Sequence, residues 1–109
     1  MPVFILTDIE GSSAKWERHS RAMEKALFLH GQILRQTIES HVGTVIKHTG
    51  DGFFVVFTAG DALGCALSVQ QKLQDEDWGE LEELRVRIAL NAGESMQRGK
   101  DYFGPAITV

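Results

Sequence analysis

The order of strand-like and helix-like segments is the feature of this sequence that most restricts its fold. Four short apolar segments have the length and composition of strands: residues 3–8, 44–47, 53–57 and 84–90. Two longer segments carry apolar residues at helical spacing, residues 20–40 and the segment that follows Asp61, a good helix-capping residue. The chain therefore predicts a β-α-β-β-α-β succession of elements.

Right-handed crossovers fix how such strands sit in one sheet. They make the first strand parallel to the second and the third parallel to the fourth, in the spatial order 4-1-3-2. The predicted fold class is α+β: a ferredoxin-like sandwich in which helices cover one face of an antiparallel sheet. Because the first and third strands are then antiparallel neighbours, the end of one and the start of the other lie at the same edge of the sheet.

An aspartate stands at each of these two places, beside a glycine turn. Asp8 ends the apolar run in FILTDIEGSS (residues 4–13), and Asp51 precedes the third strand in KHTGDGFF (residues 47–54). Solvated turn aspartates are common, but nothing in that interpretation makes two of them meet. Divalent ions that bind phosphate take hard oxygen ligands, usually one or two carboxylates together with the phosphate itself. We therefore predict that Asp8 and Asp51 form a metal-binding pair.

Composition restricts the class of protein further. The 109 residues suit one domain, 43% are hydrophobic, and the net charge of −4 gives no basic field for nucleic acid or a membrane surface. The single cysteine, Cys65, lies among apolar helix residues and is expected to be a buried, inert thiol. No signal peptide or membrane span is visible, so we expect a cytoplasmic protein.

The remaining polar and aromatic residues give weaker signals. The segment Gly11-Ser12-Ser13 could offer backbone N–H groups and hydroxyls to phosphate, although it is also an ordinary lead into a helix. Lys47 and Asp101 receive no role from spacing alone. The four histidines show no metal-ligand spacing, so satisfied core or surface histidines are expected, with His30 on the apolar helix face. Trp16 and Trp78 are expected to anchor packing.

Four ordered motifs together resemble the class III adenylate/guanylate cyclase catalytic domain of bacterial type. They are Phe4–Ser13, Val45–Phe53, Val86–Glu94 and Asp101–Ala106. The resemblance implies that Asp8 and Asp51 bind two Mg²⁺ or Mn²⁺ ions, with the Ile9 backbone carbonyl as a further ligand. It also implies that residues 11–13 hold a triphosphate.

The same resemblance also implies which nucleotide is the substrate and how the protomers assemble. Lys47 and Asp101 match the positions that read the base, and this pair of residue types implies ATP. The sites of such enzymes form between the two protomers of a homodimer. Thr108 stands where the family has a transition-state asparagine, and the family's transition-state arginine would follow Val109. Residues 1–109 are accordingly expected to be a C-terminally incomplete cyclase domain, with further domains after it.

The resulting hypothesis is an adenylate cyclase that converts ATP to 3′,5′-cyclic AMP and diphosphate for intracellular signalling, with the 109-residue chain inactive by itself. A non-catalytic nucleotide-binding or dimerisation module is the main alternative, favoured by Thr108. A diguanylate cyclase shares the strand order but carries a Gly-Gly-Asp-Glu-Phe turn, whereas residues 49–53 lack the second acid.

Overall fold

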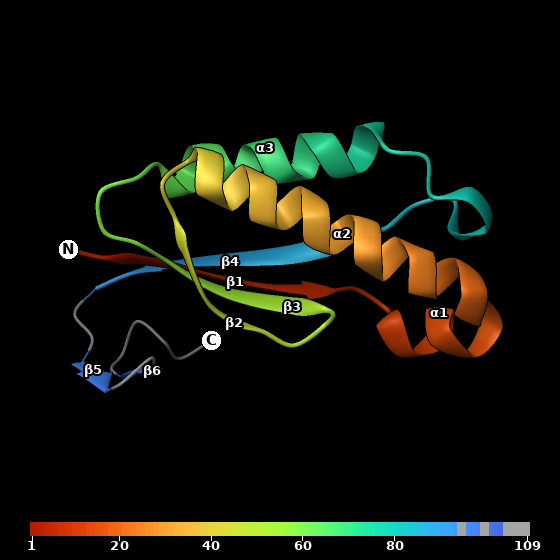
Figure 1. The fold of residues 1–109 in the computed structure, drawn as a ribbon, viewed down its shortest axis with the longest axis horizontal. Coiled ribbons are helices and arrows are strands. Elements are labelled where there is room, and N and C mark those ends of the chain that lie inside the picture. The colour runs from red at the N-terminus through yellow and green to blue at the C-terminus, as the bar shows by residue number, and fades with distance from the viewer. Residues whose placement is uncertain (94–95, 99–100, 104–109) are drawn as a thin grey trace.

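The computed structural model describes residues 1–93, 96–98 and 101–103, with side chains as far as residue 93. Figure 1 shows how the elements of this part of the chain are arranged. They are, in order, β1 (Val3–Ile9), α1 (Ser12–Arg18), α2 (Ser20–Ser40), β2 (Thr44–His48), β3 (Gly52–Phe57), α3 (Ala62–Asp75), the 3₁₀ turn η1 (Gly79–Leu81), β4 (Val86–Ala92), β5 (Met96–Arg98) and β6 (Asp101–Phe103).

The first four strands form one antiparallel sheet in the order β2-β3-β1-β4. Strand β1 is central and pairs with β3 along one edge and with β4 along the other. Helices α2 and α3 lie side by side on one face of this sheet (Figure 1). The predicted α+β class, strand order and placement of the helices are confirmed.

The main core lies between the sheet and the two long helices. Helix α2 has the predicted bounds, and its buried face includes Met23, Leu34 and Ile38. Helix α3 begins after Asp61, whose carboxylate accepts a hydrogen bond from the Gly64 backbone N–H at 2.8 Å. Cys65 is buried in this core as predicted, and burial, followed by the charge of Asp61, raises the pKa of its thiol to about 11. The thiol is therefore protonated and unreactive near neutral pH.

One of the two tryptophan predictions and the start of the fourth strand need correction. Trp78 is buried and donates its indole N–H to the Leu73 carbonyl at 2.9 Å, as an anchor should. Trp16 is 38% exposed, because it lies on the short helix α1, which has no buried residue. The fourth strand begins at Val86 rather than residue 84, since β1 ends at Ile9, directly opposite Val86.

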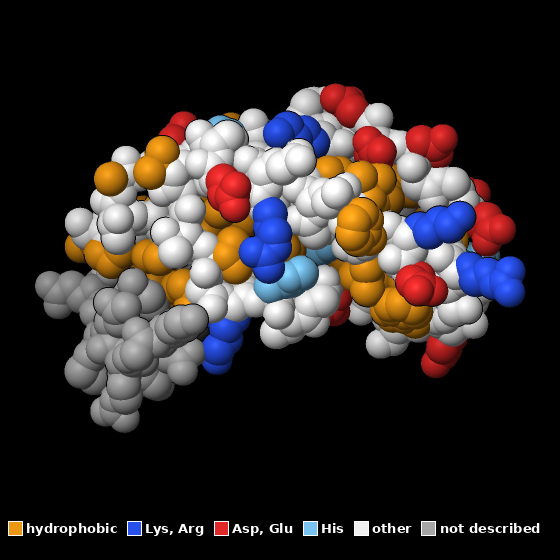
Figure 2. All heavy atoms as spheres, in the orientation of Figure 1, with side chains coloured by type: hydrophobic (Ala, Val, Ile, Leu, Met, Phe, Trp, Pro, Cys, Tyr) orange, Lys and Arg blue, Asp and Glu red, His pale blue; other side chains and the backbone are white. Residues whose placement is uncertain are grey.

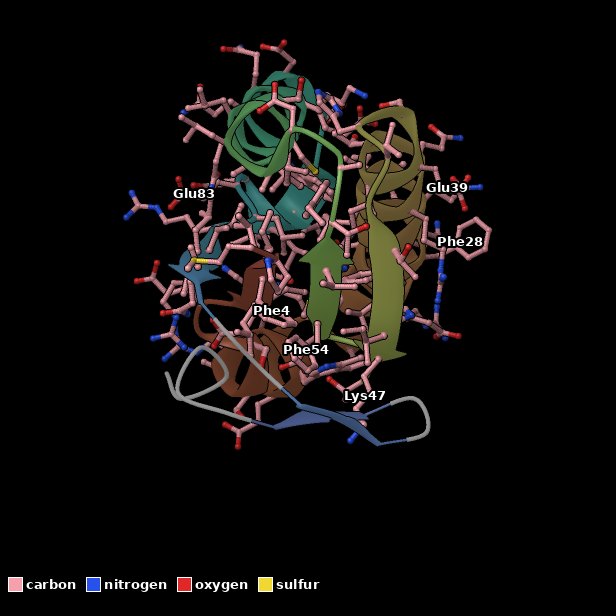
Figure 3. All side chains as sticks on the ribbon, turned by 90° about the vertical axis from the view of Figure 1, so that its left-hand side faces the viewer. Phe4, Phe28, Glu39, Lys47, Phe54 and Glu83 are labelled. Carbon is pink, nitrogen blue, oxygen red and sulfur yellow. The ribbon has the colours of Figure 1, made fainter. Side chains whose placement is uncertain are left out.

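The face of the sheet that the long helices leave uncovered has a small apolar cluster of its own. Phe4 and Val56 are buried there, and the rings of Phe4 and Phe54 lie 5.7 Å apart. Figure 3 shows both phenylalanines on the side of the sheet away from α2 and α3. Strands β5 and β6 pair in a separate antiparallel hairpin, which Figures 1 and 3 place on this same side.

The surface seen in Figure 2 carries acidic and basic side chains interspersed with apolar ones. Phe28 is a largely exposed aromatic side chain, at 70%. It points outward from α2 in Figure 3. Over the residues that the structure describes, none of the helices combines the length and the apolar character needed to cross a membrane.

Candidate active site

The two motif aspartates meet at one edge of the sheet. In the pairing of β1 with β3, Asp8 lies opposite Gly52, the residue that follows Asp51. The Ile9 backbone N–H donates to the Asp51 carbonyl at 3.1 Å, so the two motifs are hydrogen-bonded neighbours. The convergence that the topology predicts is therefore present in the backbone. The Ile9 side chain is buried in the core, which anchors this end of β1.

The turn that carries Asp51 is held tightly against β1. The Thr49 N–H donates to the Gly52 carbonyl at 3.0 Å, and Gly50 has a φ of 90°, which side-chain-bearing residues rarely adopt. A Cβ on Gly52 would lie 2.7 Å from the Thr7 carbonyl oxygen, so only glycine fits there. The glycines on both sides of Asp51 thus fix the position of its backbone relative to Asp8.

The glycine-serine segment of the first motif reaches the aspartate of the second. Gly11 has a left-handed backbone with φ of 68°, and α1 begins directly after it at Ser12. The Ser12 hydroxyl donates a hydrogen bond to the Asp51 carboxylate at 3.2 Å. Ser13 is exposed at the same end of α1. The structure therefore brings residues 11–13 beside the paired acids.

The Asp8 carboxylate is paired with Arg87, a residue outside the predicted site. Arg87, opposite Asp8 in the pairing of β1 with β4, donates its Nε–H to one carboxylate oxygen at 3.0 Å and an Nη2–H to the other. This hydrogen bond, together with the charge of Asp8, raises the pKa of Arg87 further. The sequence predicts a strand over residues 84–90, but which residue lies opposite Arg87 depends on the register of β4 against β1.

The side chains of His48, Phe53 and Arg35 stack behind the turn that carries Asp51. The His48 ring stacks on Phe53 at a centroid distance of 4.0 Å, and its Nε2 lies 3.2 Å from the Gly50 carbonyl. On the other side of the ring, Nδ1 is 3.1 Å from Arg35 Nη2 of helix α2. Since Arg35 can only donate, His48 accepts at Nδ1 and donates from Nε2 to the turn. Sequence spacing gave His48 no role.

His30 lies in the same layer and departs from the expectation for it. The side chain is fully buried on the core face of α2, 5.7 Å from the Phe53 ring centroid. Among the described residues neither ring nitrogen has a hydrogen-bond partner, so the prediction of a satisfied histidine is wrong. Burial above all, and then the neighbouring His48, lowers the pKa of His30 to about 4, while Asp51 acts in the opposite direction.

The predicted base-reading residues are placed only in part. Lys47 lies one residue before the end of β2, opposite Phe54, on the uncovered side of the sheet (Figure 3). It is therefore at the same edge as the Asp51 turn. Asp101 begins β6, opposite Arg98, and its side chain lies outside the description. Thr108 is outside the described residues.

The donor set at this edge consists of oxygen atoms. Within residues 1–93, 96–98 and 101–103 no group of three or more His, Cys, Asp or Glu side chains is placed to hold a metal ion. Two carboxylates and a backbone carbonyl are ligand types that suit an ion completing its coordination with water and phosphate. The Asp8 carboxylate already contacts one cation, the guanidinium of Arg87.

Comparison with known proteins identifies the family to which this fold belongs. An adenylate cyclase of Schizosaccharomyces pombe is 33% identical over 129 aligned positions, which cover 94% of this chain and 8% of that protein. An adenylate/guanylate cyclase/hydrolase from Silicibacter pomeroyi has a TM-score of 0.80 and 31% identity, over 98% of this chain and 65% of that one. An adenylate cyclase from Trypanosoma brucei has a TM-score of 0.83 at 22% identity, over 96% of this chain and 64% of that one. No family model matches the sequence.

The strand order, the paired acid turns and these similarities define a nucleotidyl cyclase fold. The chain belongs to the class III nucleotidyl cyclase catalytic domains. It spans about a twelfth of the fungal relative's length and about two thirds of the two solved chains.

Proposed function

We propose that this chain is part of an adenylate cyclase that converts ATP to 3′,5′-cyclic AMP and diphosphate in the cytoplasm. The observation that carries the proposal is the hydrogen-bonded contact between the two aspartate motifs at one sheet edge. The sequence similarity to a fungal adenylate cyclase over 94% of the chain supports the choice of reaction.

Asp8, Asp51 and the Ile9 carbonyl would hold two Mg²⁺ or Mn²⁺ ions. Their hard oxygens fit these ions, and the fixed turn keeps them together. When bound, such ions favour deprotonation of a ribose 3′-hydroxyl and neutralise charge at the α-phosphate. The protein's own contribution is to hold Asp8 near the end of the central strand β1 and Asp51 in the adjoining turn, whose backbone is hydrogen-bonded to β1.

The segment Gly11–Ser13 would bind the triphosphate. It lies beside the acids, and Ser12 already contributes a hydroxyl to this edge. Lys47, one residue before the end of β2, would donate to a ring acceptor of adenine, while Asp101 would accept from the exocyclic amine. In a homodimer these base-reading residues would serve the metal site of the partner protomer.

A non-catalytic nucleotide-binding or dimerisation module is the second candidate. The observation that favours it is Thr108 in place of the transition-state asparagine. We further propose that residues 1–109 are the N-terminal portion of a longer catalytic domain and form no cyclic nucleotide alone. The alignment covers 64% and 65% of the two similar solved cyclase chains, which supports the proposal that the catalytic domain is longer than these residues.

The proposal is tested with Asp8→Asn and Asp51→Asn in the full-length protein, assayed for cyclic AMP with Mn²⁺ and ATP. Each change removes a ligand charge while keeping the shape, so activity should fall by at least about a hundredfold. Glu39→Gln is the matched control, because Glu39 is an exposed acid one residue before the end of α2 (Figure 3). Near wild-type turnover in either aspartate variant would contradict the two-metal assignment. Nucleotide binding without any product in the wild-type protein would favour the second candidate.

A further inference from the structure

The two acids of the site differ in what already contacts them. Asp51 accepts a hydrogen bond from a neutral hydroxyl, that of Ser12, at 3.2 Å. Asp8 has both carboxylate oxygens engaged by the guanidinium of Arg87, one from Nε and one from Nη2. A bidentate arginine is a planar, charged partner that matches a carboxylate well. One half of the proposed metal site therefore contains a cation supplied by the chain.

The contact is specified by the sheet. Asp8 and Arg87 are directly opposite in the pairing of β1 with β4, where facing side chains are close enough to interact. Arg85, two residues earlier in the segment that leads into β4, has its own partner, with Nε 3.1 Å from a Glu83 carboxylate oxygen. Two arginines of the same charge and similar exposure thus differ in whether they contact the proposed metal ligand.

We infer that Arg87 is a resident counter-ion of Asp8, which a divalent ion must displace before both carboxylates can bind metal. This inference rests on the proposed metal-binding function of Asp8. The physical reason is competition, because the carboxylate oxygens that accept from Arg87 are the atoms a Mg²⁺ or Mn²⁺ ion would use. Arg87 is a positioning residue that keeps Asp8 ordered and charge-compensated while metal is absent.

The exposure of the pair makes this exchange feasible. The side chain of Arg87 is 66% exposed and that of Asp8 is 46% exposed. Exposed ion pairs are weak and are screened by salt, so a divalent ion can replace the arginine. A buried pair in the same place would block the site, whereas this one can only lower its apparent affinity.

The test measures metal affinity directly, by electron paramagnetic resonance of free Mn²⁺ titrated into the full-length protein. Arg87→Met removes the competing cation, and Arg85→Met is the matched control that changes the net charge equally. We expect Mn²⁺ to bind Arg87→Met about two- to fivefold more tightly than Arg85→Met, the range set by the strength of exposed ion pairs. Arg87→Lys, which keeps the charge but cannot bind in a bidentate manner, should lie between wild type and Arg87→Met.

A second readout follows the arginine itself. In a Mg²⁺ titration monitored by nuclear magnetic resonance, the side-chain Nε–Hε signal of Arg87 should shift as the ion binds, and that of Arg85 should not. Equal Mn²⁺ affinities of Arg87→Met and Arg85→Met, with wild type still binding more tightly than Asp8→Asn, would overturn the inference and leave the proposed function standing. If wild type and Arg87→Met bind no better than Asp8→Asn, both fail.

Discussion

The buried histidine of helix α2 should make the stability of this domain depend on pH. His30 is fully buried, neither of its ring nitrogens has a hydrogen-bond partner among the described residues, and its pKa is lowered from 6.5 to about 4. Between these two values the unfolded chain binds a proton that the folded chain does not. Stability is therefore complete above about pH 6.5 and is lost as the pH falls toward 4.

The size of the effect follows from the two pKa values. With a pKa of 6.5 in the unfolded chain and about 4 in the folded one, the free energy of unfolding falls by about 2 kcal/mol at pH 5 and about 3 kcal/mol at pH 4, at 1.36 kcal/mol per pKa unit. Replacing the imidazole by a similar apolar volume, as in His30→Leu, removes this titration. The same change should stabilise the protein at pH 7.5 by about 1–3 kcal/mol, since it removes buried polar atoms without partners.

Urea unfolding at pH 7.5 and pH 5 measures both quantities. Both proteins contain the other histidines, so the comparison of wild type with His30→Leu cancels their contribution to the pH dependence of stability. Gln36→Leu, an exposed change on the same helix that adds no titrating group, supplies the control and should keep the wild-type loss between the two pH values. If wild type and His30→Leu lose the same stability between pH 7.5 and 5, the buried neutral imidazole is not the cause.

Two further predictions concern the nucleotide and the turn. Changing Lys47 to Glu together with Asp101 to Cys should raise the ratio of GTP to ATP turnover in the full-length protein, because guanine presents different donors and acceptors; an unchanged ratio would show that these residues do not read the base. Gly52→Ala should destabilise the domain by about 1–3 kcal/mol, because its Cβ would lie 2.7 Å from the Thr7 carbonyl oxygen. Gly31→Ala, where the Cβ meets only ordinary contact, is the control, and equal unfolding midpoints for the two variants would refute the close approach.

The amino-acid sequence by itself determined the strand order and therefore the meeting of Asp8 with the turn at Asp51. The physical reason is that these features follow from local periodicity and from the handedness of crossovers, which need no knowledge of side-chain packing. The bounds of α2, residues 20–40, and the cap at Asp61 were also readable, because apolar spacing and capping chemistry are local.

Tertiary structure alone decided which side chains contact the two acids. Arg87 meets Asp8 because the register of β1 against β4 places them opposite, and a shift of one residue would put Arg87 on the other face. The burial of His30 without a hydrogen-bond partner likewise depends on how Phe53 and α2 pack together. Register and packing are set by the sum of many weak contacts across distant segments, so no local pattern in the sequence specifies them.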